Sequence, residues 1–201
     1  MSKSYIADHV VLGLDIKAYS QRDLSRQKFA QEVLDRCLDK AFPTTTWDAG
    51  KAIWIDGGDG GFVLLQGSEQ SVFNAVQDFY EALNWENKNT QPQDQIKVRA
   101  AIHIDQVVRW ETRFGPKYTG HAINNCARLL SAMSKLLEGQ VVCSGAFLEK
   151  VNALGTDVIN ERLKDITDKH GLTHLVYNIY RSPGFGEKAL SEERHPDPLT
   201  W

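Results

Sequence analysis

The stretch WIDGGDGGFVLL, residues 54–65, places a single carboxylate between glycines at the tip of a predicted β-hairpin. Apolar and β-branched residues flank this tip on both sides, as they do in paired strands. Glycine admits the positive φ angles that a tight turn requires. Asp59 therefore either suits the turn and nothing more, or is held at the tip for a ligand, and the rest of the chain must decide between the two.

The length and composition are those of an ordinary globular protein. The 201 residues predict one domain over 1–201, with a folded core at 8–180 and an irregular polar tail at 181–201. A net charge of -3 argues against a general nucleic-acid binder, which carries a basic stripe. No segment approaches the ~20 apolar residues of a membrane span, and the first residues lack a signal-peptide pattern. We therefore expect a cytoplasmic protein without nucleic-acid or membrane partners.

Three cysteines are widely separated in apolar surroundings, and they are Cys37, Cys126 and Cys143. This spacing matches neither a disulfide framework nor a zinc site, and the histidines show no metal-ligand spacing. The cysteines are predicted to be buried free thiols in a reducing compartment.

Hydrophobic periodicity predicts hairpins alternating with helices. The expected helices are 23–42, 68–85 (capped by Ser68), 120–137 and 146–154. The expected strands are 9–16, a hairpin at 47–65, one or two strands in 96–114 with a turn near Ile104–Asp105, then 139–145, 157–166 and 172–181. Gly115 and Pro116 are expected to break the pattern. This order predicts an α+β fold, an α/β sandwich with helices packed on a mixed sheet.

Two carboxylates are expected at one end of this sheet. Asp15 closes the first strand, and Asp59 lies at the hairpin tip. If their strands are neighbours, a hard cation such as Mg²⁺ or Mn²⁺ offsets the repulsion between the two carboxylates. The following segment IKAYS, residues 16–20, would present backbone N–H groups to a polyphosphate near the start of the next helix. These features alone fit polymerases, cyclases and phosphatases equally well.

The helix at 120–137 adds a polar pair. In INNCARL, Asn124 and Arg128 are four residues apart and share one helix face. An arginine there suits the charge that grows on a phosphoryl group, and an asparagine suits the hydrogen bonds of a sugar. Taken alone, the pair favours a solvated polar helix face over a binding site.

Taken together, five segments resemble the catalytic domain of class III nucleotidyl cyclases. They are LDIKAYS, GGDGGFVLL, VRAAIHIDQVV, GHAINNCARLLSAM and EGQVVCSG, which follow the family's order and spacing across residues 8–180. The resemblance implies a ferredoxin-like or palm-like, mainly antiparallel mixed sheet. It also implies conversion of a nucleoside triphosphate to a 3′,5′-cyclic nucleotide and pyrophosphate.

The resemblance assigns a role to each site residue. Asp15, Asp59 and the Ile16 carbonyl would hold two Mg²⁺ or Mn²⁺ ions, which activate the ribose 3′-hydroxyl and neutralise the triphosphate. Asn124 would position the ribose, and Arg128 would stabilise the charge on the α-phosphate. The remaining substrate-binding candidates are Tyr19 and Ser20 in the loop after the first strand, and Lys169, counted back from Tyr177, with Lys164 nearby. In this family the two halves of a site come from opposite subunits, which implies a head-to-tail homodimer.

The base-reading positions depart from the purine cyclases. Where adenylate cyclases carry a lysine and guanylate cyclases usually a glutamate, this chain has Ile55, or Trp54 if Gly57 shifts the register. The second position falls in PKYTG, which offers Lys117, Tyr118 and Thr119, so neither purine pair is present. A pocket without polar partners discriminates poorly between purines. Trp54 either stacks on a smaller ring or is a core or interface aromatic.

The chain therefore looks most like the stand-alone pyrimidine cyclases of bacterial Pycsar antiphage systems. These make cyclic UMP or cyclic CMP, which activates a separate effector protein, and we favour UTP over CTP. Two alternatives remain: an adenylate cyclase with an atypical base pocket, and a degenerate cyclase-like module that binds nucleotide without turnover. A diguanylate cyclase is rejected because Gly60 stands where that family needs an acidic residue after the aspartate.

Overall fold

The computed structural model describes residues 4–67, 69–133, 141–153, 158–163, 165–167 and 173–181. Its strands are β1 (Ser4–Ile16), β2 (Ala52–Asp56), β3 (Gly60–Leu65), β4 (Val98–Thr112), β5 (Gly115–Gly120), β6 (Val141–Ser144), β7 (Val158–Arg162), β8 (Ile166–Thr167), β9 (Thr173–His174) and β10 (Val176–Arg181). Its helices are the 3₁₀ turn η1 (Tyr19–Gln21), α1 (Leu24–Ala41), α2 (Thr44–Asp48), α3 (Glu69–Lys88), α4 (His121–Met133) and α5 (Gly145–Ala153).

Within the described ranges, eight of these strands form one sheet. Its order is β2-β3-β1-β4-β6-β10-β7, with β5 paired to β4 beside this path. All pairs in the sheet are antiparallel except β4 with β6, which is parallel. The run β1-α1-β2-β3-α3-β4, with strand order β2-β3-β1-β4, is the ferredoxin-like arrangement. The structure confirms the expected α+β fold with a mainly antiparallel mixed sheet.

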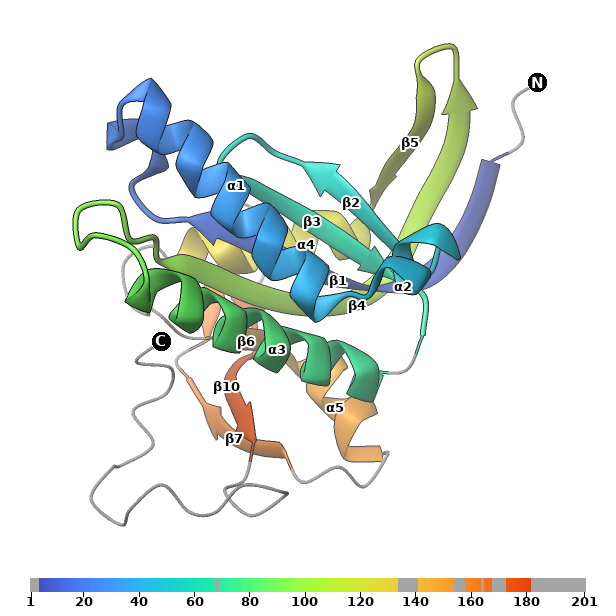
Figure 1. Ribbon diagram of the computed structural model, residues 1–201. Coiled ribbons are helices and arrows are strands. Elements are labelled where there is room, and N and C mark those ends of the chain that lie inside the picture. Colours follow the sequence, from blue (N-terminus) through green and yellow to red (C-terminus); the bar gives the residue numbers. More distant parts are fainter. Residues whose placement is uncertain are drawn as a thin grey trace.

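Helices cover both faces of this sheet (Figure 1). Helices α1 and α3 pack against each other on one face, and α5 joins the same apolar cluster. Helix α4 packs on β1 and β4 from the opposite face, over a second apolar cluster. The N-terminal half of β1 and the β4–β5 hairpin project together beyond these layers (Figure 1). We call the two surfaces of the sheet the α1/α3 face and the α4 face.

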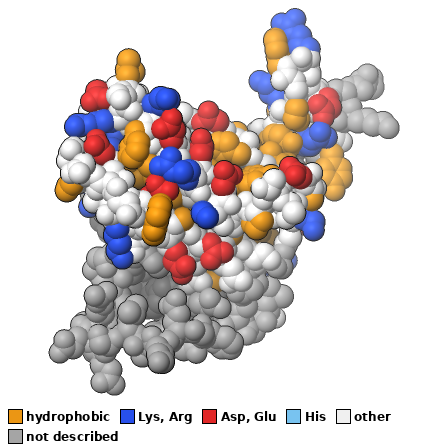
Figure 2. Space-filling view, viewed as in Figure 1, with side chains coloured by type: hydrophobic (Ala, Val, Ile, Leu, Met, Phe, Trp, Pro, Cys, Tyr) orange, Lys and Arg blue, Asp and Glu red, His pale blue; other side chains and the backbone are white. Residues whose placement is uncertain are grey.

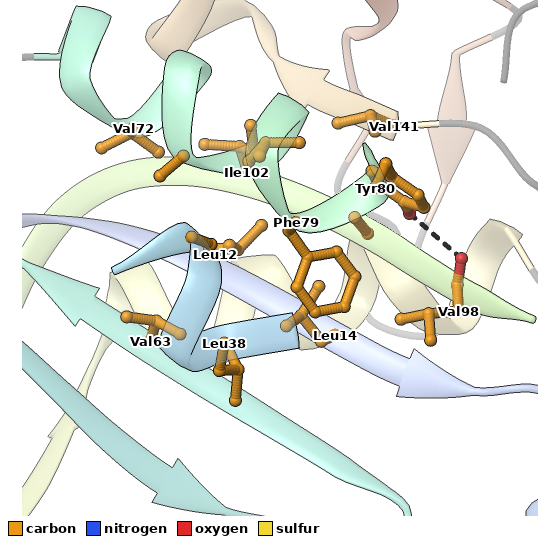
Figure 3. Packing of buried hydrophobic residues seen from close by; sticks show 14 of the residues in the cluster. Leu12, Leu14, Leu38, Val63, Val72, Phe79, Tyr80, Val98, Ile102 and Val141 are labelled. Carbon is orange, nitrogen blue, oxygen red and sulfur yellow. Dashed lines mark hydrogen bonds between the residues drawn. The ribbon is translucent and has the colours of Figure 1, made fainter. Parts of the chain in front are cut away.

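Alternation along β1 separates the two clusters. Leu12 and Leu14 belong to the cluster on the α1/α3 face, whereas Val11 belongs to the cluster under α4. Figure 3 shows Leu12 and Leu14 beside Phe79 of α3. Because side chains of a strand point alternately to opposite faces, the parity of a residue number in β1 fixes its face.

Local contacts explain where the main helices begin and how they hold together. The Asp23 carboxylate caps α1 by accepting a hydrogen bond from the Arg26 backbone N–H at 2.9 Å. Arg36 of α1 donates to both carboxylate oxygens of Glu86 in α3, at 2.9 and 2.7 Å. On the buried side of α3, the Tyr80 hydroxyl donates to the Val98 carbonyl of β4 at 3.0 Å (Figure 3).

Residues 96–114 hold a single strand, one of the two alternatives left open by the sequence, and the turn expected near Ile104–Asp105 is wrong. Strand β4 runs without interruption through Ile104–Asp105, and its hairpin turns instead at 113–114. Residues Ser4–Asp8 of β1 pair with Trp110–Gln106 of β4, and this pairing carries the strand past the expected turn. Gly115 and Pro116 begin β5 rather than ending a strand.

Several smaller expectations have clear outcomes. The predicted start of the hairpin at residue 47 is wrong, because Trp47 lies in the short helix α2. The three cysteines are buried and free, as predicted. Ser68, Lys164, Lys169, the end of the predicted helix at 134–137 and the tail from 182 onwards lie outside the described residues.

The surface that carries α1 and α3 mixes charges of both signs. Figure 2 shows acidic and basic side chains interspersed over this face, without a continuous basic stripe among the described residues on it. None of the described helices is long and apolar enough to cross a membrane.

Candidate active site

The structure brings Asp15 and Asp59 to the same end of the sheet. Strand β1 pairs with β3 so that Asp15 lies opposite Gly60, the residue after Asp59. The Ile16 backbone N–H donates to the Asp59 carbonyl oxygen at 2.8 Å. Asp59 is exposed at the hairpin tip, and Asp15 is one-fifth exposed, at 21% of its side chain. Two aspartates from distant parts of the sequence therefore lie on adjacent stretches of backbone beside the loop that follows β1.

Glycine is required at this tip because the backbone of β1 passes very close. Gly60 has a φ of 156°, and a Cβ there would overlap the Leu14 carbonyl oxygen and lie 2.9 Å from the Asp15 Cα. Gly58 has a φ of 89°, in the left-handed region that favours glycine. Any side chain at position 60 would push the hairpin away from β1 and separate the two carboxylates.

Hydrogen bonds also hold the hairpin tip to α1 and stabilise the turn internally. The Gln31 side-chain amide of α1 donates to the Gly58 carbonyl, and Gly57 donates to the Gly60 carbonyl at 2.8 Å. The Asp56 carboxylate accepts the Gly58 N–H at 2.9 Å. These bonds fix the backbone on both sides of Asp59, whose own carboxylate remains exposed to solvent.

Arg99 is a site residue that the sequence analysis missed. It lies opposite Asp15 in the β1–β4 register and donates to Asp15 Oδ2 through its Nε at 2.8 Å and through a terminal nitrogen. Both hydrogen bonds from Arg99 end on Oδ2, so Oδ1 is the carboxylate oxygen of Asp15 that a cation would contact. The arginine stands in VRAAI, but only the strand pairing shows that it reaches Asp15.

Asp15 points to the α4 face. Gly13, two residues earlier in β1, is so close to α4 that a Cβ there would lie 2.7 Å from Leu130 Cδ1 and 2.8 Å from Cys126 Sγ. By the alternation of a strand, Asp15 shares the face of Gly13 and Val11. The candidate metal ligand and helix α4 therefore lie on the same side of the sheet.

Helix α4 presents its polar pair away from the sheet. Cys126 is fully buried against β1 and β4, whereas Asn124 is exposed and Arg128 partly exposed. The Arg128 guanidinium donates a hydrogen bond to the Oδ1 atom of Asn125 at 2.9 Å. Asn125 is a second site residue that the sequence analysis missed, because motif matching assigned no role to that position.

The base-pocket candidates lie on opposite faces of the sheet. Ile55 packs against the cluster under α4, so it lies on the same face as Asp15. Trp54 packs against the cluster on the α1/α3 face, and its indole lies over Gly61, where a Cβ would come within 2.7 Å of two ring atoms. The structure therefore does not bring Trp54 to the face that carries the carboxylates and α4.

The remaining candidates are scattered. Tyr19 is partly buried against the α1/α3-face cluster, and Ser20 is exposed beside it in η1. Tyr118 of β5 packs against the cluster under α4, so Lys117, its exposed neighbour in the strand, points the other way. Lys169 lies outside the described residues, and its role stays a prediction.

The donor atoms at the sheet end fit a hard divalent cation that arrives with its substrate. Asp15 and Asp59 supply carboxylate oxygens, and the adjoining loop supplies backbone carbonyls, which suit Mg²⁺ or Mn²⁺. Within the described ranges there is no group of three or more His, Cys, Asp or Glu side chains that could form a closed metal cage. Two carboxylates completed by phosphate oxygens are a common magnesium arrangement.

Comparison with known proteins identifies the fold. No family model and no curated protein matches the chain. Solved structures do match. The catalytic core of a rhodopsin-guanylyl cyclase with converted specificity, in complex with ATPαS, is 14% identical with a TM-score of 0.67, over 90% of this chain and 99% of the other. An adenylate/guanylate cyclase/hydrolase from Silicibacter pomeroyi is 18% identical with a TM-score of 0.63, over 90% and 99%.

A third similar structure is a non-canonical dimer. It is the guanylyl cyclase domain of the RhoGC fusion protein from the aquatic fungus Blastocladiella emersonii, which is 15% identical with a TM-score of 0.63, over 88% of this chain and 97% of the other. Across these comparisons the chain has the fold of class III cyclase catalytic domains, as the sequence resemblance implied.

Proposed function

We propose that this chain is a nucleotidyl cyclase that converts a nucleoside triphosphate into its 3′,5′-cyclic nucleotide and pyrophosphate. The observation that carries the proposal is that Asp15 and Asp59 lie side by side at the loop after β1, with Asp15 on the side of the sheet that carries α4. The fold shared with adenylyl and guanylyl cyclase domains supports the same reaction. Fold alone does not fix chemistry, so the site residues carry the argument.

The reaction breaks one P–O bond and forms another at the same phosphorus. The ribose 3′-oxygen attacks the α-phosphorus, the bond to the β-phosphate oxygen breaks, and the 3′-hydroxyl proton passes to solvent. Two bound Mg²⁺ or Mn²⁺ ions supply Lewis acidity for the 3′-hydroxyl and positive charge for the triphosphate. Asp15, Asp59 and the Ile16 carbonyl are the protein groups that would hold them.

Helix α4 supplies the other half of the site. Arg128 stabilises the charge that develops on the α-phosphate, and Asn124 orients the ribose through hydrogen bonds. Asn124 is exposed on the outer side of α4, where a second molecule can reach it. We propose a homodimer in which Asp15 and Asp59 of one subunit face Asn124 and Arg128 of the other.

The projecting hairpin supports such a dimer. Tyr5 and Ile6 of β1 are 59% and 58% exposed, and Phe114 at the hairpin turn is 77% exposed. Large apolar side chains that remain this exposed are typical of interaction surfaces. Sedimentation of the purified protein tests the dimer, and a monomer at micromolar concentration that still turns over substrate would contradict it.

For the substrate we propose UTP, with CTP as the next choice. Of the two base-pocket candidates in β2, Ile55 is the one on the α4 face, and its side chain offers no hydrogen bond to a purine edge. An adenylate cyclase with an atypical pocket is the alternative within the same chemistry, and a nucleotide-binding module without turnover is the alternative outside it. Incubation with Mn²⁺ and ATP, GTP, CTP or UTP separately, followed by mass analysis of products, distinguishes all three.

Asp59→Asn tests the assignment of the site. The substitution keeps the size of the side chain but removes the charge that a cation needs, so turnover should fall by at least about 100-fold while the folded circular dichroism spectrum is kept. Asp56→Asn is the matched control in the same hairpin, because the asparagine still accepts the Gly58 N–H. Equal losses in both variants, or full activity in Asp59→Asn, would contradict the assignment.

The biological role that we propose is signalling in defence against phage. Following the resemblance to the pyrimidine cyclases of Pycsar systems, we propose that the product signals phage infection to a separate effector protein that binds cyclic UMP or cyclic CMP. Bacteria that carry the cyclase and its effector should resist phage, and the Asp59→Asn variant should abolish that protection. Equal protection by the variant would separate the defence role from catalysis.

A further inference from the structure

The Asn125 side chain lies between a candidate catalytic group and the protein interior. Its Oδ1 atom accepts a hydrogen bond from a terminal nitrogen of Arg128 at 2.9 Å. Its Nδ2 atom lies 3.3 Å from His103 Nε2 on the neighbouring strand β4. A carboxamide has one oxygen that accepts and one nitrogen that donates. Both ends are therefore engaged, and the two contacts fix the orientation of the amide.

The contact with His103 leads deeper into the core. His103 is 7% exposed, and its Nδ1 atom lies 2.7 Å from the hydroxyl of Ser144, which is 6% exposed. Ser144 ends β6, and its hydroxyl also accepts the Phe147 backbone N–H of α5 at 3.3 Å. The Asp105 carboxylate also faces His103 Nε2, at 3.8 Å, which is beyond hydrogen-bond distance. Because the closer Asn125 amide nitrogen only donates, we take His103 Nε2 as the acceptor and Nδ1 as the atom that carries the proton toward Ser144. In the series Arg128, Asn125, His103 and Ser144, each side chain therefore donates a hydrogen bond to the next one.

We propose that Asn125 is a positioning residue that sets the orientation of the Arg128 guanidinium. This inference rests on the function proposed above, in which Arg128 stabilises charge on the α-phosphate. An arginine side chain has several rotatable bonds, and holding it before the substrate arrives lowers the entropy lost in the transition state. Asn125 and Arg128 are three residues apart on α4, a spacing that places their side chains together. Ser144 and His103 hold Asn125 in turn.

The contact predicts a specific kinetic signature. Asn125 bonds to the arginine rather than to the substrate, so its loss should lower kcat by about tenfold, the size expected for one hydrogen bond to a charged group. KM should change by less than about twofold, because a group needed mainly in the transition state affects kcat rather than substrate binding. A purely structural asparagine would instead change thermal stability without this split.

The first experiment compares Asn125→Leu in two backgrounds. In the otherwise native chain kcat should fall about tenfold, and in an Arg128→Ala background it should fall less than about twofold, because the group that Asn125 positions is already absent. A tenfold loss in both backgrounds would overturn the proposal, and so would no loss in the native background. Ser131→Ala, which removes a hydroxyl bonded to the Ala127 carbonyl on the same helix, is the matched control and should keep native kcat.

The second experiment does not depend on turnover. The ¹⁵N order parameter of the Arg128 Nε–H should fall below about 0.6, the flexible range, in Asn125→Leu. Asn125→Asp keeps the oxygen that accepts from Arg128 and should keep the side chain ordered. Disorder in both variants would show that packing around His103, and not the oxygen, orients Arg128. An ordered Arg128 in a protein that cyclises no nucleotide would uphold the positioning and refute the proposed function.

Discussion

Gly13→Ala tests whether α4 is seated on β1 as closely as the structure shows. The new Cβ would lie 2.7 Å from Leu130 Cδ1 and 2.8 Å from Cys126 Sγ, well inside van der Waals contact. Leu130 can relieve part of the overlap by rotating. Cys126 is fully buried and its thiol contacts the Val11 and Ala101 carbonyls at 3.6 and 3.2 Å, so it has nowhere to move. The helix must shift outward.

Two opposing effects set the magnitude. Overpacking a well-filled core costs about 1–3 kcal/mol, and replacing glycine by alanine inside a strand returns about 0.5–1 kcal/mol. Taking the middle of each range, the net loss for Gly13→Ala is about 1 kcal/mol. A domain of this size changes its Tm by roughly 2–4 °C per kcal/mol, so we expect a decrease of about 2–4 °C in a thermal melt followed by circular dichroism at fixed protein concentration.

A second substitution makes the test specific. Cys126→Ala removes the sulfur that the new Cβ meets, so the double variant should recover about 1 kcal/mol relative to the sum of the single variants. Gly67→Ala is the matched control, because a Cβ there meets nothing within 4 Å. If Gly13→Ala melts like Gly67→Ala, or if the two substitutions at 13 and 126 are strictly additive, the close seating of α4 is refuted.

Three further predictions concern the α1/α3 side of the sheet. Tyr80→Phe should cost about 1 kcal/mol in urea unfolding, because the Val98 carbonyl loses its buried donor. The hydrogen bond from Arg36 holds the pKa of Glu86 below its usual 4.5, so this pair stabilises the fold above that value and the contribution disappears as the pH falls through the lowered pKa. Glu86→Gln should therefore destabilise the protein by about 0.5–1 kcal/mol at pH 7 and flatten its loss of stability in acid. Burial raises the pKa of Cys37 to about 12, so a thiol reagent at pH 8 should label it slowly until the protein is denatured.

Patterns that are local in the sequence predicted the fold well. Hydrophobic spacing located α1 and α3 to within a few residues, and the glycine-rich tip located Asp59. The prediction failed where pairing partners are distant. Asp105 is a turn-forming residue type, yet β4 continues through it because the N-terminal half of β1 pairs alongside. A rule that considers only neighbouring residues cannot identify β1 as the pairing partner of this segment.

In the candidate site, too, motifs identified some residues and only the strand pairing identified others. Asp15 and Asp59 are visible as motif residues, whereas the contact of Arg99 with Asp15 arises from the register of two strands more than 80 residues apart. Choosing between Trp54 and Ile55 also required the register, because a shift of one residue exchanges the two faces of a strand. No sequence motif marks Asn125, because its proposed role depends on its contacts with Arg128 and His103 in the folded chain.

The order of the central strands has a consequence for how the chain folds during synthesis. Strand β1 lies between β3, which ends at Leu65, and β4, which begins only at Val98. As the chain leaves the ribosome, β1 can pair with β3 while its other edge waits for a strand not yet made. Asp15 and Asp59 thus become neighbours first, and Arg99 joins them later. Until then β1 has one edge of unpaired backbone N–H and C=O groups, to which another chain can pair, and long-range pairing of this kind makes folding slow.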